Sequence, residues 1–79
     1  MKIGDVLNLD GISGTVSAVY SDGAVRSICL PGLNPAMSPG YRFRSFGLPV
    51  HSVTFDAVAQ TTTLGFYHYD AQGNIVDDA

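Results

Sequence analysis

The chain has 79 residues, a net charge of −3 and no glutamate. Its length fits one small domain, residues 1–79, and no segment approaches the ~20 apolar residues of a membrane-spanning helix. The acidic balance disfavours a non-specific nucleic-acid binder, which normally presents a basic surface. All seven acids are aspartate, a residue of turns, and the only lysine is Lys2. The chain is instead rich in residues that favour strands, namely Val, Ile, Thr, Tyr and Phe. This composition predicts an antiparallel all-β domain.

Cys29 is the only cysteine, so an internal disulfide is excluded. The N-terminal residues contain no apolar run of the kind that forms a signal peptide. Small secreted domains usually carry several cysteines. We therefore expect a reducing, cytoplasmic location, with Cys29 as a small buried hydrophobe.

The first strands are predicted from alternation and turn residues. Val6–Leu9 reads as a short strand that ends at Asp10-Gly11, and 12–20 alternates polar and apolar residues with period two. Asp22-Gly23 predicts a two-residue type I′ turn into a strand over 24–30. The predicted register pairs Tyr20 with Val25, Ala18 with Ser27, and Val16 with Cys29, and so places Cys29 on the apolar face as an inert thiol.

Residues 31–40 form a predicted irregular loop, because three prolines and two glycines fall close together there. The loop is long for a domain of this size. Its apolar residues are Leu33 and Met37. They either plug one end of the core or face a partner.

The C-terminal part, residues 41–76, is predicted to be strands. In 41–46 the pattern sends Tyr41 and Phe43 to one face and both arginines to the other. A hairpin over roughly 50–70 follows. A turn at Ala59-Gln60 would pair Phe55 with Leu64, Val53 with Phe66 and His51 with His68, whereas a turn at Val58-Ala59 is the alternative.

The last predicted hairpin turns within 71–74, ends at Ile75-Val76 and is followed by an acidic tail, residues 77–79. The whole pattern indicates about five to six strands in a small barrel or sandwich. The opening, a short strand and then a long hairpin through Asp-Gly, resembles an SH3-like barrel over residues 1–31. The run Tyr67-His68-Tyr69-Asp70-Ala71-Gln72-Gly73-Asn74-Ile75-Val76 resembles one unit of the YD-repeat proteins, which stack many hairpins into β shells.

We find no catalytic, cofactor or metal pattern in the sequence. His51 and His68 alone are too few ligands for a stable zinc site, and no carboxylate stands at ligand spacing to either. A pairing of Cys29 with a histidine would be the minimal nucleophile and base, but the predicted register turns the thiol to the core. We therefore expect no enzyme activity, no cofactor and no bound metal.

The candidate contact residues are aromatic and arginine side chains. Aromatic and basic residues interleave at 41–46, and four rings follow one another at 66–69. Such residues are enriched in protein interfaces. A core this small cannot cover four rings on both faces of a strand. The predicted partner-binding residues are Arg42, Arg44, Phe66, Tyr67, Tyr69, Leu33 and Met37.

These features favour a non-catalytic protein-binding module that occludes a larger protein or complex, as an inhibitor or accessory protein. Phage anti-defence proteins such as anti-CRISPRs are similar in size and surface chemistry. One alternative is a small structural or assembly subunit of a phage-like particle, which should self-associate. The other is a weak nucleic-acid binder that uses Arg26, Arg42 and Arg44, with salt-dependent binding. No membrane partner is expected.

Overall fold

The computed structural model describes residues 1–33 and 37–76, and these residues form strands, turns and loops but no helix. The predicted acidic tail and the centre of the predicted loop, residues 34–36, lie outside the described residues. The strands are β1 (Val6–Leu9), β2 (Ile12–Val19), β3 (Val25–Pro31), β4 (Val50–Asp56), β5 (Thr61–Phe66), β6 (His68–Tyr69) and β7 (Ile75–Val76).

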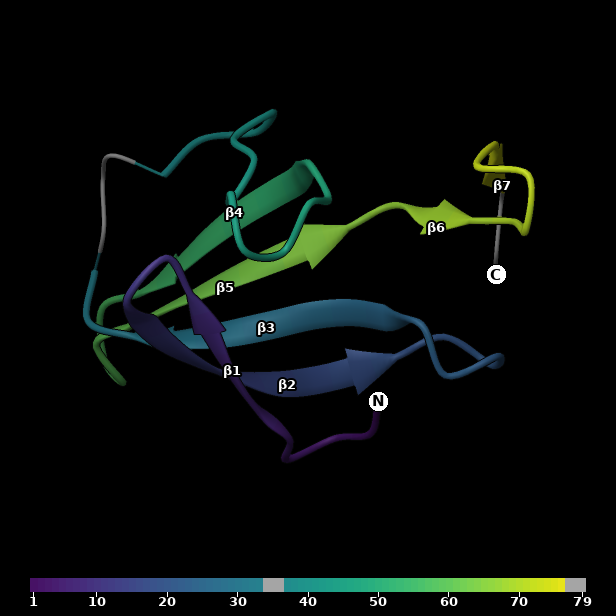
Figure 1. Ribbon diagram of the computed structural model, residues 1–79. Helices are drawn as coiled ribbons and strands as arrows, with labels where there is room; N and C mark the ends of the chain where they lie inside the picture. Colours follow the sequence, from purple (N-terminus) through teal and green to yellow (C-terminus); the bar gives the residue numbers. More distant parts are fainter. Residues whose placement is uncertain (34–36, 77–79) are drawn as a thin grey trace.

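Five strands form one antiparallel sheet in the order β1-β2-β3-β5-β4, and β6 and β7 form a separate two-stranded sheet (Figure 1). The prediction of an antiparallel all-β domain is confirmed. The larger sheet does not close into a barrel, because β1 and β4 lie at opposite edges. The small β6–β7 hairpin stands beyond the end of β5 (Figure 1).

The core lies on one face of the five-stranded sheet. Residues 37–49, which precede β4, cross this face (Figure 1) and pack Met37, Phe43, Phe46 and Leu48 against it. Phe43 is fully buried, so a residue outside any strand provides one of the largest core side chains. The strands supply the rest of the buried core: Leu9, Val16, Val25, Ile28, Leu30, Val50, Leu64 and Phe66.

The β1–β2 turn holds this covering segment in place. Asp10 and Gly11 both have positive φ, 54° and 94°, as a type I′ turn requires. The Asp10 carboxylate accepts hydrogen bonds from the backbone N–H groups of Arg44 and Ser45, each at 2.8 Å. These two bonds, Arg44 first, hold the pKa of Asp10 below its ordinary value of 3.8. An Asp-Gly turn thus joins the sheet to the segment that covers it.

The predicted type I′ turn at Asp22-Gly23 is wrong. The Gly23 N–H donates to the Tyr20 carbonyl at 2.9 Å and the Tyr20 N–H donates to the Ala24 carbonyl at 2.8 Å, so residues 21–23 form the loop. Gly23 alone has positive φ, 88°, as in a three-residue hairpin loop with a glycine in the left-handed position. The loop is one residue longer than predicted.

Bulges then change the register of β2 and β3. Ala18 pairs with Ser27 as predicted, but Val16 pairs with Ile28, and Val19 with Val25. The pairings of Tyr20 with Val25 and of Val16 with Cys29 are therefore wrong. Ser17 and Arg26 are the extra residues of the two bulges.

Cys29 consequently lies on the face opposite the core. It pairs with Thr15 on β2 and Thr63 on β5, and it is half-buried. Its neighbours along the strand, Ile28 and Leu30, fill the core. The prediction that Cys29 is buried on the apolar face is wrong.

Residues 41–46 do not form the predicted strand. An isolated bridge joins Arg42 to Pro49, and the chain turns where the Gly47 N–H donates to the Phe43 carbonyl at 2.8 Å. Gly47 has a φ of 86°, which an extended strand does not allow. Phe43 is buried and both arginines are exposed, as the alternation predicted.

The β4–β5 hairpin has the register of the alternative turn at Val58-Ala59. Val53 pairs with Leu64, and Phe55 with Thr62, so the pairings made from a turn at Ala59-Gln60 are wrong. His68 belongs to the separate hairpin and does not pair with His51. In that last hairpin the turn within 71–74 is confirmed, since the Asp70 N–H donates to the Asn74 carbonyl at 2.9 Å.

Candidate functional site

The face of the sheet opposite the core, called here the open face, carries small polar side chains. They stand in cross-strand rows fixed by the pairing of β2, β3, β5 and β4. All are exposed or half-buried, so water solvates this face without an apolar partner. The members are Thr15, Ser27, Cys29, Ser52, Thr54, Thr61 and Thr63.

The described sheet has three bulges: that at Ser17 lies in β2, and the other two flank β5 near one end of the open face. Arg26 is the extra residue in β3 and His51 is the extra residue in β4. A bulge turns two consecutive side chains toward one face, and bulges often re-aim side chains beside functional sites. Here each bulge places a nitrogen-containing side chain beside a serine, Arg26 next to Ser27 and His51 next to Ser52.

Between the bulges, β5 carries a glycine. Gly65 pairs with Ser27 on one side and Ser52 on the other. A Cβ atom at Gly65 would lie 2.4 Å from the Ser52 hydroxyl oxygen, so a side chain there would displace Ser52. The absence of a side chain leaves a trough in β5 between the two bulges, and the Ser52 hydroxyl lies over part of it.

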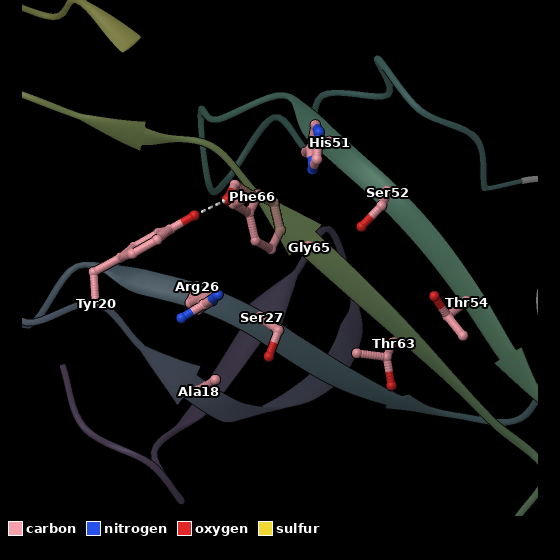
Figure 2. A pocket seen from close by; sticks show the side chains of 10 residues that line it. All are labelled: Ala18, Tyr20, Arg26, Ser27, His51, Ser52, Thr54, Thr63, Gly65 and Phe66. Atoms are coloured by element: carbon pink, nitrogen blue, oxygen red, sulfur yellow. Dashed lines mark hydrogen bonds between the residues drawn. The ribbon is translucent and has the colours of Figure 1, made fainter. Parts of the chain in front are cut away.

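The trough is the floor of a cavity of about 320 Å³, called here the bulge cleft (Figure 2). Arg26 and His51 stand on its two sides, with hydroxyl groups around the floor. The cleft is lined by Ala18, Tyr20, Arg26, Ser27, His51, Ser52, Thr54, Thr63, Gly65 and Phe66. Among these described residues none is acidic, although the chain as a whole has a net charge of −3.

Tyr20 forms the end wall of the bulge cleft. Its hydroxyl donates to the Phe66 carbonyl at 2.7 Å, which fixes the ring across the end of β5 (Figure 2). The His68 ring stacks on it with centroids 4.2 Å apart, and the Arg26 guanidinium lies 5.3 Å from its centroid. Cation–π contact of this kind restrains an exposed arginine.

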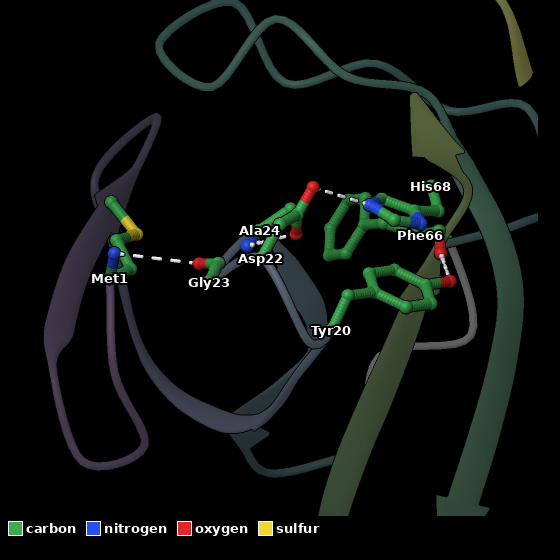
Figure 3. Close-up of polar contacts among 7 residues, drawn as sticks. All are labelled: Met1, Tyr20, Asp22, Gly23, Ala24, Phe66 and His68. Atoms are coloured by element: carbon green, nitrogen blue, oxygen red, sulfur yellow. Dashed lines mark hydrogen bonds and ion pairs between the residues drawn. The ribbon is translucent and has the colours of Figure 1, made fainter. Parts of the chain in front are cut away.

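The β2–β3 turn is tied to the same wall. His68 Nε2 lies 2.7 Å from Asp22 Oδ2, and the Asp22 Oδ1 accepts from the Ala24 N–H at 3.0 Å (Figure 3). The contact with His68 is the main cause that holds the pKa of Asp22 below 3.8. The turn, the Tyr20 ring and the chain after β5 therefore form one connected wall.

A second cavity of about 360 Å³ continues from the first and is called here the aromatic cavity. It shares Tyr20, His51 and Phe66 with the bulge cleft and extends to the β6–β7 hairpin. The His51 and Tyr67 rings lie 4.4 Å apart, and Ile75 is 59% exposed at its rim. One end of the sheet thus carries a polar, basic hollow next to an aromatic one.

The predicted partner-binding residues do not form one surface. Phe66 and Met37 are only 2% and 9% exposed and belong to the core, so they are not exposed anchors. Met37 plugs the core, the first of its two predicted alternatives. Leu33 is exposed, but it follows the Pro31–Thr61 end of the sheet, and Pro31 itself lies about 13 Å along β3 from Ser27 of the cleft.

The remaining predicted residues divide into two groups. Arg42 and Arg44 are exposed on the segment that covers the core face, where Arg42 Nη1 donates to the Gly47 carbonyl. Tyr67 lines the aromatic cavity. The Tyr69 ring contacts the Tyr67 ring edge-on, with ring centroids 6.4 Å apart. Of the predicted partner-binding residues, Tyr67 and the buried Phe66 therefore line the cavities.

Sequence reasoning missed Tyr20, Ser52 and Gly65 as cleft residues and considered Arg26 only as a nucleic-acid contact. Uniform alternation places Arg26 and Ser27 on opposite faces, and only the bulge brings them together. The basic-serine dipeptide is no guide to the cleft, because it recurs at Arg44-Ser45, which the bulge cleft does not include.

The described residues contain no group of three or more His, Cys, Asp or Glu side chains that could hold a metal ion. Cys29 lines neither cavity, so the structure does not bring it to His51 or His68 there. A helix of a length and hydropathy that would cross a membrane is not found in residues 1–33 and 37–76. Comparison with known protein families, curated proteins and solved structures gave no match.

Proposed function

We propose that the protein is a non-catalytic binding module that docks on another protein through the bulge cleft and the aromatic cavity. The observation that carries this proposal is the pair of bulges, which break regular pairing to aim Arg26 and His51 across Gly65. Bulges weaken a sheet locally, so their joint use around one hollow supports a binding role. By binding, this protein would cover a surface of its partner, as an inhibitor or an accessory subunit does.

The rim of the two cavities has the composition of a protein interface. Tyr67 is 36% exposed and Ile75 is 59% exposed, and both line the aromatic cavity, which shares His51 with the bulge cleft. Tyrosine and arginine are the residues most enriched at the energetic centres of interfaces. The free thiol of Cys29 fits a reducing setting such as the cytoplasm.

The test compares a cleft-rim variant with a matched control. Tyr67→Ala combined with Ile75→Ser removes the exposed apolar rim, while Tyr41→Ala removes a tyrosine of similar exposure, 38%, outside both cavities. Each variant is first shown to fold by circular dichroism. A protein of the native host that is retained on the immobilised parent is then purified. Its direct binding to the parent and to each variant is measured by calorimetry.

We expect the parent and Tyr41→Ala to bind with equal affinity and the rim variant to bind at least tenfold more weakly, about 1.4 kcal/mol. If the rim variant binds the partner as tightly as the parent, the proposal is wrong. It is also wrong if no protein from the host binds the parent directly. Retention of nucleic acid with a steep salt dependence would favour the nucleic-acid alternative instead. Arg26 and the pair at 42 and 44 lie on opposite sides of the sheet, which gives that alternative less support.

A second candidate function is self-assembly. The edge strand β4 exposes Phe55, which is 46% exposed, and beyond Val50, whose backbone bonds to Gly40 and Tyr41, no further strand of the described sheet flanks it. Exposed edges of this kind pair readily with another chain. An assembly subunit should multimerise with rising concentration in light scattering, and a variant Phe55→Lys should remain monomeric.

A further inference from the structure

We infer that the bulge cleft receives a carboxylate side chain of the partner, with an apolar or aromatic neighbour of that residue in the aromatic cavity. This inference rests on the proposed function and names the chemistry of the partner segment. The occupant is an extended acidic-aromatic segment of a protein. Three observations support it: charge, donor geometry and the adjacency of the two cavities.

The charge of the bulge cleft is uncompensated. Within 4.0 Å, the contact that the described residues make between a carboxylate and a basic side chain joins Asp22 to His68, and Arg26 does not take part in it. The described residues that line the cleft include no carboxylate. Arg26 therefore offers a positive charge, held against Tyr20, in a protein that is otherwise acidic. A partner carboxylate would supply the missing counter-charge.

Hydrogen-bond donors converge on the trough from both sides. The Arg26 guanidinium is a planar fork that matches a carboxylate with two parallel hydrogen bonds. Across the trough, the exposed His51 and Ser52 side chains offer a ring N–H and a hydroxyl. The Ser27 hydroxyl is already engaged, 2.6 Å from that of Ser17. The Ser52 hydroxyl occupies the position that a Gly65 side chain would take, so an anionic group would sit above it, in the cavity between Arg26 and His51.

The amount of positive charge favours a carboxylate over a phosphate group. Phosphate sites usually combine several cationic groups or a cradle of backbone N–H groups at a helix N-terminus. The described residues contain no helix, and the arginine at the cleft is Arg26. A singly charged carboxylate matches one guanidinium, whereas a phosphate dianion would stay partly unneutralised.

The aromatic cavity explains why the acid should have an apolar neighbour. Both cavities share Tyr20, His51 and Phe66, so a group in one lies beside a group in the other. Tyr67 and Ile75 line the second cavity with apolar surface. Burial of an apolar side chain there adds affinity, at roughly 25 cal/mol per Å² of apolar area removed from water.

The experiment is an NMR titration of the ¹⁵N-labelled protein with capped tetrapeptides. The probes are Ser-Asp-Phe-Ser and Ser-Phe-Asp-Ser, which present the acid before and after the ring. Matched probes replace Asp with Asn or Phe with Ala, and inorganic phosphate is titrated separately. The variant Arg26→Gln removes the charge at the cleft, and Arg44→Gln removes an exposed arginine on the other side of the sheet as a control.

We expect one of the two acidic-aromatic peptides to shift the amide signals of Gly65 and Ser52 and the side-chain Nε–H signal of Arg26. The Asn probe and the Arg26→Gln variant should each weaken binding at least tenfold, and Arg44→Gln should leave it unchanged. The Ala probe should bind more weakly and lose the shifts at Tyr67.

The inference is overturned if neither acidic peptide binds, if the Asn probe binds equally, or if Arg26→Gln has no effect. It is also overturned if phosphate alone binds as tightly as the peptides, because the site would then be a general anion site. If the purified partner binds Arg26→Gln like the parent and fails to bind the Tyr67 and Ile75 variant, the proposed function holds and only the carboxylate assignment fails.

Discussion

The imidazole Nε2 of His68 lies 2.7 Å from the Oδ2 of Asp22, and this contact joins the β2–β3 turn to the chain after β5. The two residues are far apart in sequence, yet the turn loop and the short strand β6 bring them together (Figure 3). The Asp22 side chain is 54% exposed, whereas that of His68 is 10% exposed beneath the Tyr20 ring. An exposed carboxylate thus contacts an imidazole that is largely buried.

Acid should destabilise the protein through its turn aspartates. The pKa of Asp22 is lowered from 3.8, first by the bond to His68 and then by that to Ala24, and the pKa values of Asp10 and Asp70 are lowered too. A carboxyl with a lowered folded-state pKa stabilises the fold above its unfolded value and loses this effect as the pH falls through the folded value. We expect the urea midpoint to fall from about pH 5 to pH 2.

The Asp22→Asn variant should show a flatter acid profile than the parent, because one of the three aspartates no longer titrates. Asp56→Asn is the matched control, since Asp56 also caps a turn, through bonds from the Val58 and Ala59 N–H groups, but contacts no imidazole in the described structure. Urea unfolding followed by circular dichroism at each pH gives the profiles. Parallel profiles for the parent and Asp22→Asn would show that the His68 contact does not contribute.

Gly65→Ala should destabilise the protein by about 1–3 kcal/mol, the usual cost of an added carbon in a filled site. The new Cβ would meet the Ser52 hydroxyl at 2.4 Å. The double variant Gly65→Ala with Ser52→Ala should recover most of the loss, and Ser52→Ala alone should change stability by less than about 0.5 kcal/mol. Urea unfolding measures all three. If the second substitution gives no recovery, the contact across the trough is misassigned.

Cys29 should react with a thiol reagent in the folded protein. It is half-buried on the open face, between Thr15 and Thr63, so a small aromatic disulfide reagent can reach it without unfolding. The control carries Cys29→Ser and Leu30→Cys, because Leu30 is 1% exposed on the core face. Once shown to fold, the control should react only after urea is added. If Cys29 reacts as slowly as the cysteine of the control in the folded protein, Cys29 lies in the core and the placement on the open face is wrong.

Phe43→Ala should cost about 3–5 kcal/mol, the usual loss for a fully buried phenylalanine. Small domains are stable by only about 5–15 kcal/mol, so the variant should be partly or wholly unfolded at 37 °C. Tyr41→Ala is the control: its ring packs edge-on against Phe43 at 4.9 Å but is 38% exposed, and its loss should be smaller. Thermal unfolding compares them. Equal melting temperatures for Phe43→Ala and the parent would mean that the covering segment does not complete the core.

Much of the fold follows from local sequence pattern. Val6–Leu9 and 12–19 form strands because their alternation matches a half-buried pleat, and Asp10-Gly11 turns because both positions accept positive φ. The register of β2 and β3 did not follow. It depends on bulges at Ser17 and Arg26, which let Val16, Val19, Val25 and Ile28 all reach the core, and alternation alone does not show where an extra residue is inserted.

The candidate site was less predictable than the strands. Gly65 and Ser52 look unremarkable in one sequence, and their meeting depends on the bulge at His51 and on the pairing of β5 with two strands. Residues 41–46 alternate like a strand, but Gly47 with its positive φ and the anchor of Arg44 at Asp10 bend the chain over the core instead. The run of aromatic residues therefore pointed to the cavities through Tyr67, whereas the exposed Leu33 of the predicted loop lies at the other end of the sheet.

The pairing of β3 with β5 joins two parts that each form from near neighbours in the chain. β1, β2 and β3 follow one another through short turns, as do β4 and β5, whereas Ser27 meets Gly65 only after the long connection has closed. Closing such a connection costs entropy before any contact compensates for it, so this joint should form late and limit the folding rate. Arg26 and His51 lie on opposite sides of the joint, so any ligand that bridges them binds the folded chain alone and slows its unfolding.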